Sequence, residues 1–433
     1  MSDLLIQNCL VLQVADDGGR AEILPDQDIL VRGNSIEAVQ PTARADSSHF
    51  HTCLDAQGML AMLGLINTHA HVPMVLFRGL VEDTSLDKWF NNYIWPLENK
   101  LQPEDVYWGM LLGLIEMIEA GITAVADHYF YMDQAAQAVE KIGARALLGW
   151  AMFGSQGQSM IEHTARFVQN WQGAAGDRIR TIMAPHAPYT CDMDFLRATV
   201  RQAEKLGVGI HIHVSETKEQ TQASLNSCGL TPIQVLEQTG VLGAPTILAH
   251  ACGALPRDIE LLSRYPAGIA HAPKTYLKLA MDIASIPDFR RVGLPVGLAT
   301  DGAASNNTLD LWESLRLMAL VQKNRQGDPE VLTVAEALHI ATVESACVFG
   351  RGANLGKLAP GYLADLILID LGGVHHQPNH NVLANLVYSM RPTDVQTVIA
   401  DGEIVIRDRQ ILTVDKHEVI SRVQSSLKTL QQR

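Results

Sequence analysis

The chain of 433 residues is long enough for a catalytic barrel of about 250–300 residues together with a second, smaller domain. Hydrophobic residues make up 47% of it and charged residues 18%, which is typical of a folded enzyme and excludes long disordered stretches. The net charge of -14 is spread along the chain without a basic cluster, so nucleic acids and anionic membrane surfaces are poor partners and a small molecule fits better.

No targeting or membrane-spanning segment is expected. The first residues do not show a basic segment followed by an apolar core, and no apolar run reaches the length of a membrane span. The six cysteines lie far apart without Cys-x-x-Cys spacing, which indicates reduced thiols. We therefore expect a cytoplasmic protein, and we expect a homodimer only because two-fold oligomers are common.

Both ends of the chain show strand patterns. Residues 3–60 alternate apolar and polar side chains over short runs that are separated by turn residues, which is typical of an antiparallel sheet. The same pattern returns near the other end, where two strand-like runs flank Asp401-Gly402, a strong two-residue hairpin signal. Residues 1–60 and 361–433 are therefore predicted to build one composite β-domain, a β-sandwich made from both termini.

The central residues 61–360 alternate strand-like and helical runs. The clearest predicted helix spans residues 104–119, where apolar side chains recur at three- and four-residue spacing and Gly121 ends the pattern. Residues 192–206 and 309–324 show further helical segments.

Eight strand-like runs lie among these helices, and most of them end in a histidine or an aspartate. Eight β/α units in about 300 residues predict a (β/α)₈ barrel, in which the active site lies at the carboxyl ends of the strands. A doubly wound open sheet is less favoured, because no Gly-x-Gly-x-x-Gly follows the first strand. The runs end near His69, His128, Trp150, His186, His213, His250, His271 and Asp301.

A metal site is the first chemical feature that these strand ends predict. His69 and His71 are two residues apart on one predicted strand, so both side chains point the same way and can hold one ion. Such a pair alone is a weak signal, but other strand ends supply matching residues. Three histidines and one carboxylate suit zinc, and they also accept ferrous iron or manganese. The predicted ligands are His69, His71, His213 and Asp301.

Catalytic roles follow from residues beside these ligands. His211 alternates with His213 and is the competing ligand, but His213 is favoured because Glu216 then lies three residues beyond it. An ion of this kind activates water. Glu216 is predicted to deliver a proton to a ring nitrogen, Asp301 to accept a proton from water, and His250 to steady the developing charge.

The remaining histidines are not predicted to be metal ligands or catalytic residues. His128 and His271 also end predicted strands and are interpreted as packed residues or as supports for the ligands. The histidines outside the strand-end pattern are expected at the surface or in ordinary hydrogen bonds.

Five segments resemble the 5′-methylthioadenosine/S-adenosylhomocysteine deaminase family of the amidohydrolase superfamily. They occur in the family's order along the whole predicted barrel, and together they are a strong signal although each alone is moderate. The segments are Gly64-Leu65-Ile66-Asn67-Thr68-His69-Ala70-His71, Trp95-Pro96-Leu97-Glu98, Pro185-His186-Ala187-Pro188-Tyr189, His213-Val214-Ser215-Glu216-Thr217 and Thr300-Asp301-Gly302-Ala303-Ala304-Ser305-Asn306-Asn307.

The resemblance implies a zinc-dependent deaminase that acts on a purine nucleoside. It implies that Glu98 and His186 hold the ribose hydroxyls, roles that residue spacing alone does not reveal. Trp89 is similar to an aromatic residue that lines the family's substrate pocket. Glu216 and Asp301 would also contact the purine as they exchange protons with it.

One departure from the family bears on the substrate. Members that use S-adenosylhomocysteine carry arginines beyond the Gly-x-Arg-Ala segment of the third strand, whereas this chain has no further arginine between residues 143–146 and Arg166. An unpaired carboxylate would forgo about 1.5–3 kcal/mol per charge-assisted bond. Trp150, Met152 and Phe153 instead predict an apolar wall that suits a methylthio group, unless they are core residues of the strand.

We therefore expect hydrolytic deamination of 5′-methylthioadenosine, with adenosine and S-adenosylhomocysteine as further candidates. The alternative is an s-triazine hydrolase or a free-base deaminase on the same scaffold, which would not need Glu98 and His186 to hold a ribose. A two-metal site bridged by a modified lysine is disfavoured, because the fourth strand ends at His186. A non-catalytic binding barrel is a remote alternative, because such a protein should have lost ligands.

Overall fold

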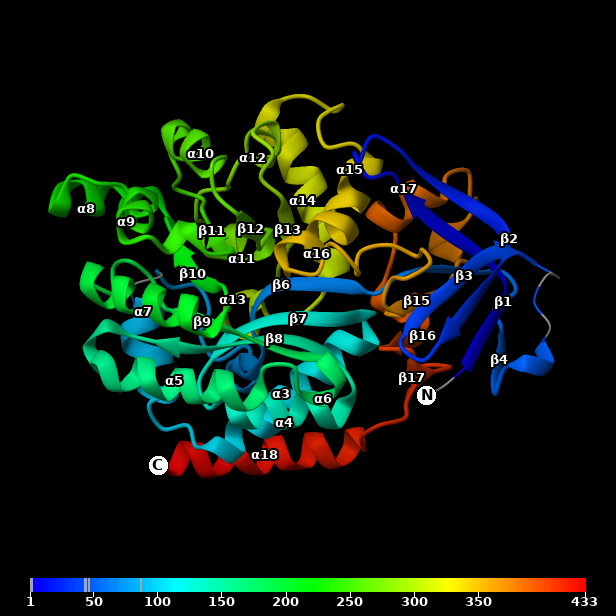
Figure 1. The fold of residues 1–433 in the computed structure, drawn as a ribbon, viewed down its shortest axis with the longest axis horizontal. Coiled ribbons are helices and arrows are strands. Elements are labelled where there is room, and N and C mark those ends of the chain that lie inside the picture. The colour runs from blue at the N-terminus through cyan, green and yellow to red at the C-terminus, as the bar shows by residue number, and fades with distance from the viewer. Residues whose placement is uncertain (1–2, 43–44, 46, 86–87) are drawn as a thin grey trace.

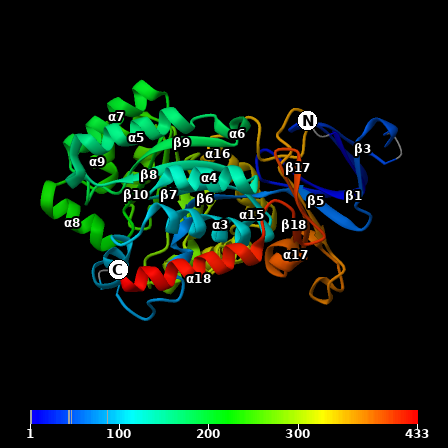
Figure 2. The ribbon, with the colours of Figure 1, turned by 90° about the horizontal axis from the view of Figure 1, so that it is seen from below.

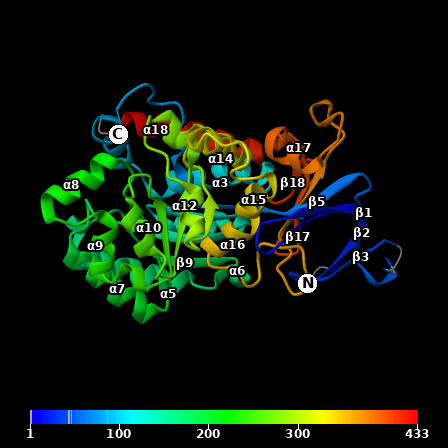
Figure 3. The same ribbon diagram turned by 90° about the horizontal axis from the view of Figure 1, so that it is seen from above.

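The computed structural model describes residues 3–42, 45, 47–85 and 88–433. Figure 1 shows two bodies side by side: a barrel surrounded by helices, and a sheet that contains the first strands of the chain together with strands from its last part. The view from above agrees, with β1 to β3 at the end of the molecule that lies away from helices α8 and α9 (Figure 3).

The barrel consists of parallel strands that follow one another around a ring. β13 pairs with β12, and β14, which begins three residues after β13 ends, pairs with β6, so the last strand closes the ring. The predicted (β/α)₈ barrel is therefore confirmed. The strands are β6 (Leu65–His71), β7 (Ile122–Tyr129), β8 (Arg145–Met152), β9 (Ile179–Pro185), β10 (Ile210–Val214), β11 (Thr246–His250), β12 (Ala267–His271), β13 (Val296–Leu298) and β14 (Asp301–Gly302).

Helices lie around and beyond these strands. They are α2 (Trp95–Glu98), α3 (Pro103–Glu119), α4 (Met132–Ile142), α5 (Gly157–Trp171), α6 (Ala174–Asp177), α7 (Met193–Leu206), α8 (Lys218–Cys228), α9 (Pro232–Thr239), α10 (Pro256–Leu262), α11 (Pro273–Lys278), α12 (Ile286–Arg291), α13 (Ala303–Asn306), α14 (Leu311–Gln326), α15 (Val334–His339), α16 (Ser345–Val348), α17 (Val382–Tyr388) and α18 (Lys416–Gln432). Shorter helical segments include η2 (Val72–Phe77) and η3 (Trp89–Ile94), which follow β6.

The three helices predicted from the sequence are present, with ends set by capping side chains. α3 begins at Pro103, a residue that fits the first helical turn because it lacks an N–H donor. Asp192 caps α7 by accepting a hydrogen bond from the Phe195 amide at 2.8 Å. Asp310 caps α14 in the same way, so that helix begins two residues later than its apolar pattern predicts.

The second sheet combines both ends of the chain. β5 pairs antiparallel with β15, which joins the first strands to the last ones. The predicted hairpin at Asp401-Gly402 is confirmed: both residues have positive φ, of 53° and 81°, as the favoured two-residue turn requires. The strands are β1 (Asp3–Val14), β2 (Ala21–Arg32), β3 (Ser35–Pro41), β4 (Thr52–Asp55), β5 (Met59–Leu63), β15 (Leu366–Asp370), β16 (Val395–Ala400), β17 (Glu403–Arg407) and β18 (Gln410–Ile411).

The last helix leaves this sheet and lies along the barrel helix α3 (Figure 2). The Lys416 ammonium donates to Glu119 at 2.6 Å at one end of the contact, and Arg433 donates to Asp105 at 2.5 Å at the other. The division into a β-domain of residues 1–60 and 361–433 and a barrel of 61–360 stays a prediction. Within the described part of the chain, no helix is both long and apolar enough to cross a membrane.

A buried ion network joins the barrel to the second sheet. Arg145, at the start of β8, donates through Nε to Asp365 at 2.9 Å and through Nη2 to Asp401 at 2.8 Å, and only 2% of Arg145 is exposed. Arg145→Ala leaves both carboxylates without this partner and should lower the free energy of unfolding in urea by about 3–5 kcal/mol.

Arg197→Ala is the matched control, because the pair of Arg197 and Asp194 is exposed and should contribute about 0–1 kcal/mol. Equal losses of unfolding free energy in the two variants would contradict a structural role for the buried network.

Candidate active site

A cavity with an empty volume of about 710 Å³ lies at the carboxyl ends of the barrel strands. Aromatic and apolar side chains from the segment between β6 and α3 cover one side of it, among them Trp89, Phe90 and Trp95. The strand ends and the segments that follow them supply most of its polar lining, which includes His71, His128, His186, His213, Glu216, His250, Asp301 and Ser305.

Two imidazoles are oriented by backbone carbonyls. His71 donates its Nδ1–H to the His128 carbonyl at 2.6 Å, and His213 donates its Nδ1–H to the His186 carbonyl at 2.8 Å. Each Nε2 therefore carries a free lone pair, and the two Nε2 atoms are 3.3 Å apart. Carbonyl acceptors of this kind typically fix the tautomer of metal-binding histidines.

The two competing histidines of β10 occupy different positions. His211 places its Nε2 2.8 Å from the Nδ1 of His69 and so orients the His69 ring by a hydrogen bond. His213 instead lines the cavity. Among the described residues, no partner hydrogen-bonds the buried Nε2 of His69, which lies 3.8 Å from the Asp301 carboxylate. A buried polar atom without a partner is costly, and a cation would satisfy it.

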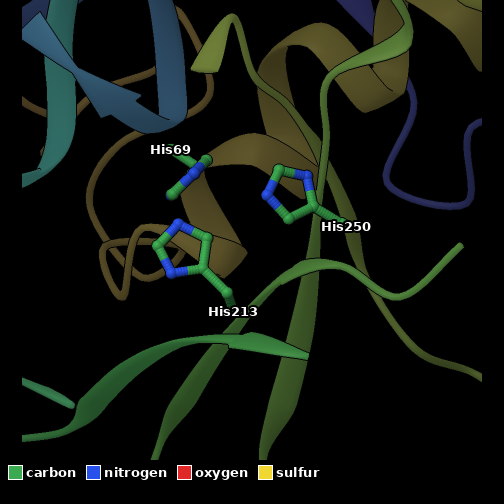
Figure 4. A group of neighbouring side chains, drawn as sticks. All are labelled: His69, His213 and His250. Atoms are coloured by element: carbon green, nitrogen blue, oxygen red, sulfur yellow. The ribbon is translucent and has the colours of Figure 1, made fainter. Parts of the chain in front are cut away.

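Ligand-type atoms from four strands converge at this point. The rings of His69, His213 and His250 point toward one another (Figure 4). Their ligand atoms lie within 4.8 Å of one another, as do those of His69, His71 and Asp301. Burial lowers the pKa of His69, His71 and His213, so these imidazoles stay neutral, which is the form that binds a metal. The residues present therefore fit a divalent cation.

The backbone is strained where these side chains leave the strands. Positive φ values occur at Ser215 (46°), His250 (77°), Ala251 (52°) and Asp301 (64°), none of which is glycine. Each such residue costs on the order of 1–3 kcal/mol, and strain of this kind concentrates at functional sites. The Asp301 carboxylate accepts hydrogen bonds from the Gly302 amide at 2.8 Å and from the Ser305 hydroxyl at 3.1 Å, which fix its orientation.

Each of the two glutamates in the cavity is held by a tyrosine hydroxyl. Tyr189 donates to Glu216 at 2.9 Å, and Tyr129 donates to Glu98 at 2.7 Å. Burial raises the pKa of Glu98 to about 7. Neither tyrosine was predicted from the sequence, although Tyr189 belongs to one of the five family-like segments and Tyr129 follows a histidine at a strand end.

The residues expected to contact a nucleoside line the same cavity. His186 stacks on Phe153, with ring centroids 4.7 Å apart and planes inclined by 22°, and its Nδ1 lies 2.9 Å from the Thr190 hydroxyl. Trp89 is buried and lines the cavity with Glu98. Their proximity agrees with the predicted site, while the role of each residue stays a prediction.

The predicted apolar wall is only partly at the cavity. Phe153 lines it, but Met152 is fully buried and matches the alternative interpretation as a core residue. Trp150 lines a second cavity, with an empty volume of about 1230 Å³. The two cavities share four lining residues, Trp95, Glu98, Phe130 and Phe153. Among the described residues, the lining of the second includes His163 but no arginine or lysine.

Residues 60–405 match the model of the amidohydrolase family. The chain belongs to the amidohydrolase family. A 5-methylthioadenosine/S-adenosylhomocysteine deaminase from Pelotomaculum thermopropionicum is 41% identical to it over 427 residues, which cover 98% of each chain. A 5′-deoxyadenosine deaminase from Methanosarcina acetivorans is 37% identical over 434 residues, which cover 99% of each chain.

A solved adenosine deaminase from Xanthomonas campestris with bound zinc has the same fold. The two structures superpose with a TM-score of 0.92 at 28% identity, over 100% of this chain and 99% of that one. The family resemblance noted in the sequence is thus confirmed, and this amidohydrolase is a hydrolase that acts on C–N bonds. A divalent metal site is supported by both the relative's zinc and the histidine cluster.

Proposed function

We propose that this amidohydrolase is a zinc-dependent deaminase of purine nucleosides with 5′-methylthioadenosine as its preferred substrate. The reaction replaces the 6-amino group with oxygen from water and releases ammonia and the inosine analogue. The observation that carries the proposal is that one cavity contains both the histidine cluster and the pair Glu98 and His186. The names of the similar deaminases support the same substrate class.

The proposed metal ligands are His69, His71, His213 and Asp301. When bound there, zinc would supply a Lewis acid that activates water at neutral pH. The zinc in the similar adenosine deaminase supports zinc as the bound ion, although ferrous iron and manganese also bind histidine and carboxylate ligands.

Three side chains are proposed to move or steady charge. Glu216 protonates the ring nitrogen next to carbon 6, and Asp301 accepts a proton from the attacking water and passes it to the leaving amine. His250 hydrogen-bonds the incoming oxygen and so stabilises the charge that develops on it. The deep burial of Glu216 and His250 strengthens these interactions, because little water competes for them.

Glu98 and His186 are proposed to bind the ribose hydroxyls, with Trp89 beside them as a wall of the substrate pocket. Tyr129 already donates to one oxygen of Glu98, so the other oxygen is available to the ribose. Holding the sugar in this way fixes carbon 6 near the histidine cluster and reduces the entropy cost of the reaction.

The second cavity supports a preference for an uncharged 5′-substituent. It meets the first at Glu98, the proposed ribose contact, so a group on carbon 5′ would extend toward it. Its lining includes Trp95, Phe130 and Trp150, and among the described residues it contains no arginine that would pair with the carboxylate of S-adenosylhomocysteine. A methylthio group can pack against these aromatic side chains without an unmatched charge.

The raised pKa of Glu98 predicts a pH effect on binding. The carboxylate accepts ribose hydroxyls better than the neutral acid does, so KM for 5′-methylthioadenosine should fall as pH rises through about 7, the pKa of Glu98. Glu98→Gln should raise KM by roughly 10- to 100-fold and abolish this pH dependence. Steady-state kinetics at several pH values measures both effects.

Glu104→Gln is the control for that experiment, because Glu104 lies at the start of α3 and does not line the cavity. An unchanged KM in Glu98→Gln would contradict the ribose contact.

Product analysis tests the reaction itself. Zinc-loaded enzyme should convert 5′-methylthioadenosine to one equivalent each of ammonia and 5′-methylthioinosine, identified by mass spectrometry, and a chelator should abolish the conversion. Adenine, which lacks the ribose, should be a poor substrate. Rapid turnover of adenine or an s-triazine with inert nucleosides would favour the free-base or triazine hydrolases instead.

A further inference from the structure

Tyr189 contacts the residue proposed to transfer the proton. It lies in the turn between β9 and α7, and Glu216 follows the neighbouring strand β10. The Tyr189 hydroxyl crosses between these segments and donates to Oε1 of Glu216 at 2.9 Å. Although half of the tyrosine is exposed, its hydroxyl end thus reaches the carboxylate of a buried residue, since Glu216 is only 5% exposed.

The turn that carries Tyr189 is held firmly. The His186 amide donates to the Met152 carbonyl at 2.8 Å, the Thr190 amide to the Ala187 carbonyl at 3.1 Å, and the Gly154 amide to the Thr190 carbonyl at 3.0 Å. The Tyr189 ring also packs edge to face on His186, with centroids 5.6 Å apart and an interplanar angle of 86°. These contacts leave the hydroxyl little freedom to move away from Glu216.

The direction of the hydrogen bond is fixed by chemistry. Burial of the hydroxyl and the nearby Glu216 raise the pKa of Tyr189 well above its usual value, so the phenol stays protonated and donates. The Glu216 oxygen that accepts this hydrogen bond, Oε1, is less available to carry the carboxyl proton. Oε2 of Glu216 is left for the proton that goes to the substrate.

We infer that Tyr189 is a positioning residue, which orients the Glu216 carboxyl and assigns its transferable proton to Oε2. The inference rests on the proposed role of Glu216 as the proton donor. Without the phenol, the carboxyl group can rotate and carry its proton on either oxygen, so fewer encounters with the substrate are productive.

Tyr189→Phe removes only the hydroxyl and tests this role. The kcat for 5′-methylthioadenosine should fall about tenfold, which corresponds to the loss of roughly one neutral hydrogen bond, while KM changes less than about twofold. Zinc content and the midpoint of thermal unfolding should stay at wild-type values. Tyr93→Phe is the matched control, because Tyr93 is 46% exposed and does not line the cavity; its kcat should not change.

A double-mutant cycle separates this role from a general structural one. In Glu216→Gln the transferable proton is absent, so adding Tyr189→Phe should cause no further loss of kcat. An equal tenfold loss in both backgrounds, or a Tyr189→Phe variant with wild-type kcat, would overturn the inference and leave the proposed function intact. Wild-type activity in Glu216→Gln alone would instead contradict the proposed mechanism.

Discussion

Replacing Glu216 by glutamine should lower kcat for 5′-methylthioadenosine by about 100- to 10,000-fold, the range typical of lost general acid catalysis. Glutamine keeps the shape of the side chain and can still accept the hydrogen bond from Tyr189, but it has no acidic proton for the ring nitrogen. KM and zinc content should change little, because Glu216 lies three residues beyond the proposed ligand His213 and is not assigned to the metal. The loss of adenosine absorbance in the ultraviolet measures kcat, and elemental analysis measures zinc.

Glu219→Gln provides the matched control. Glu219 is exposed in the first turn of α8, three residues beyond Glu216, and does not line the cavity. Its variant should retain wild-type kinetics. A fully active Glu216→Gln enzyme would contradict the role of Glu216, whereas loss of zinc in that variant would mean that the residue acts through the metal site.

His69→Asn should abolish both zinc binding and turnover. His69 belongs to both groups of converging ligand atoms, and its buried Nε2 has no hydrogen-bond partner among the described residues. Asparagine is too short to place a donor atom at the same position. Zinc content after metal loading and gel filtration should fall from about one ion per chain to less than about 0.1, since loss of even a supporting residue costs 10- to 100-fold in affinity.

His271→Asn is the control for the loss of a buried imidazole. His271 ends the barrel strand β12 and is fully buried, but it belongs to neither of the ligand groups that contain His69. This variant should keep its zinc. Retention of a full equivalent of zinc by His69→Asn would exclude His69 from the site.

Local sequence patterns were sufficient to predict most helices and strands of the barrel. The apolar spacing of α3 is periodic over four turns, and the Asp192 cap lies directly before the pattern of α7. Strand ends were also visible, because a histidine or aspartate interrupts an apolar run where a barrel strand meets the active-site face. The start of α14 was misplaced by two residues, because the cap at Asp310 outweighs the apolar residue before it.

The choice between His211 and His213 could not be made from alternation alone. The two residues are two apart on β10 and point to the same side of the strand, so either fits a ligand. The two side chains differ in their depth within the barrel. His211 hydrogen-bonds the Nδ1 of His69 below the cavity, while His213 lines the cavity. Depth in a barrel depends on how neighbouring strands are staggered, which no local pattern records.

The third barrel strand, β8, is a second case in which the sequence could not predict the position of individual side chains. β8 is buried on both faces, so its apolar residues do not alternate with polar ones, and the sequence cannot tell which side chains reach a cavity. Trp150, Met152 and Phe153 consequently looked alike, yet Trp150 lines the second cavity, Met152 is buried in the core and Phe153 lines both cavities. The tyrosines that hold Glu98 and Glu216 were missed because each contact joins two segments that lie far apart in the sequence.

The most direct test compares kcat/KM of the zinc-loaded enzyme for 5′-methylthioadenosine, adenosine and S-adenosylhomocysteine, followed by the loss of ultraviolet absorbance. A clear preference for 5′-methylthioadenosine is the predicted result, because the cavity contains the proposed ribose-binding pair and the aromatic side chains proposed to face the 5′-substituent. Equal or better use of S-adenosylhomocysteine would mean that another cation meets its carboxylate. Absence of turnover with every nucleoside would contradict the proposed function.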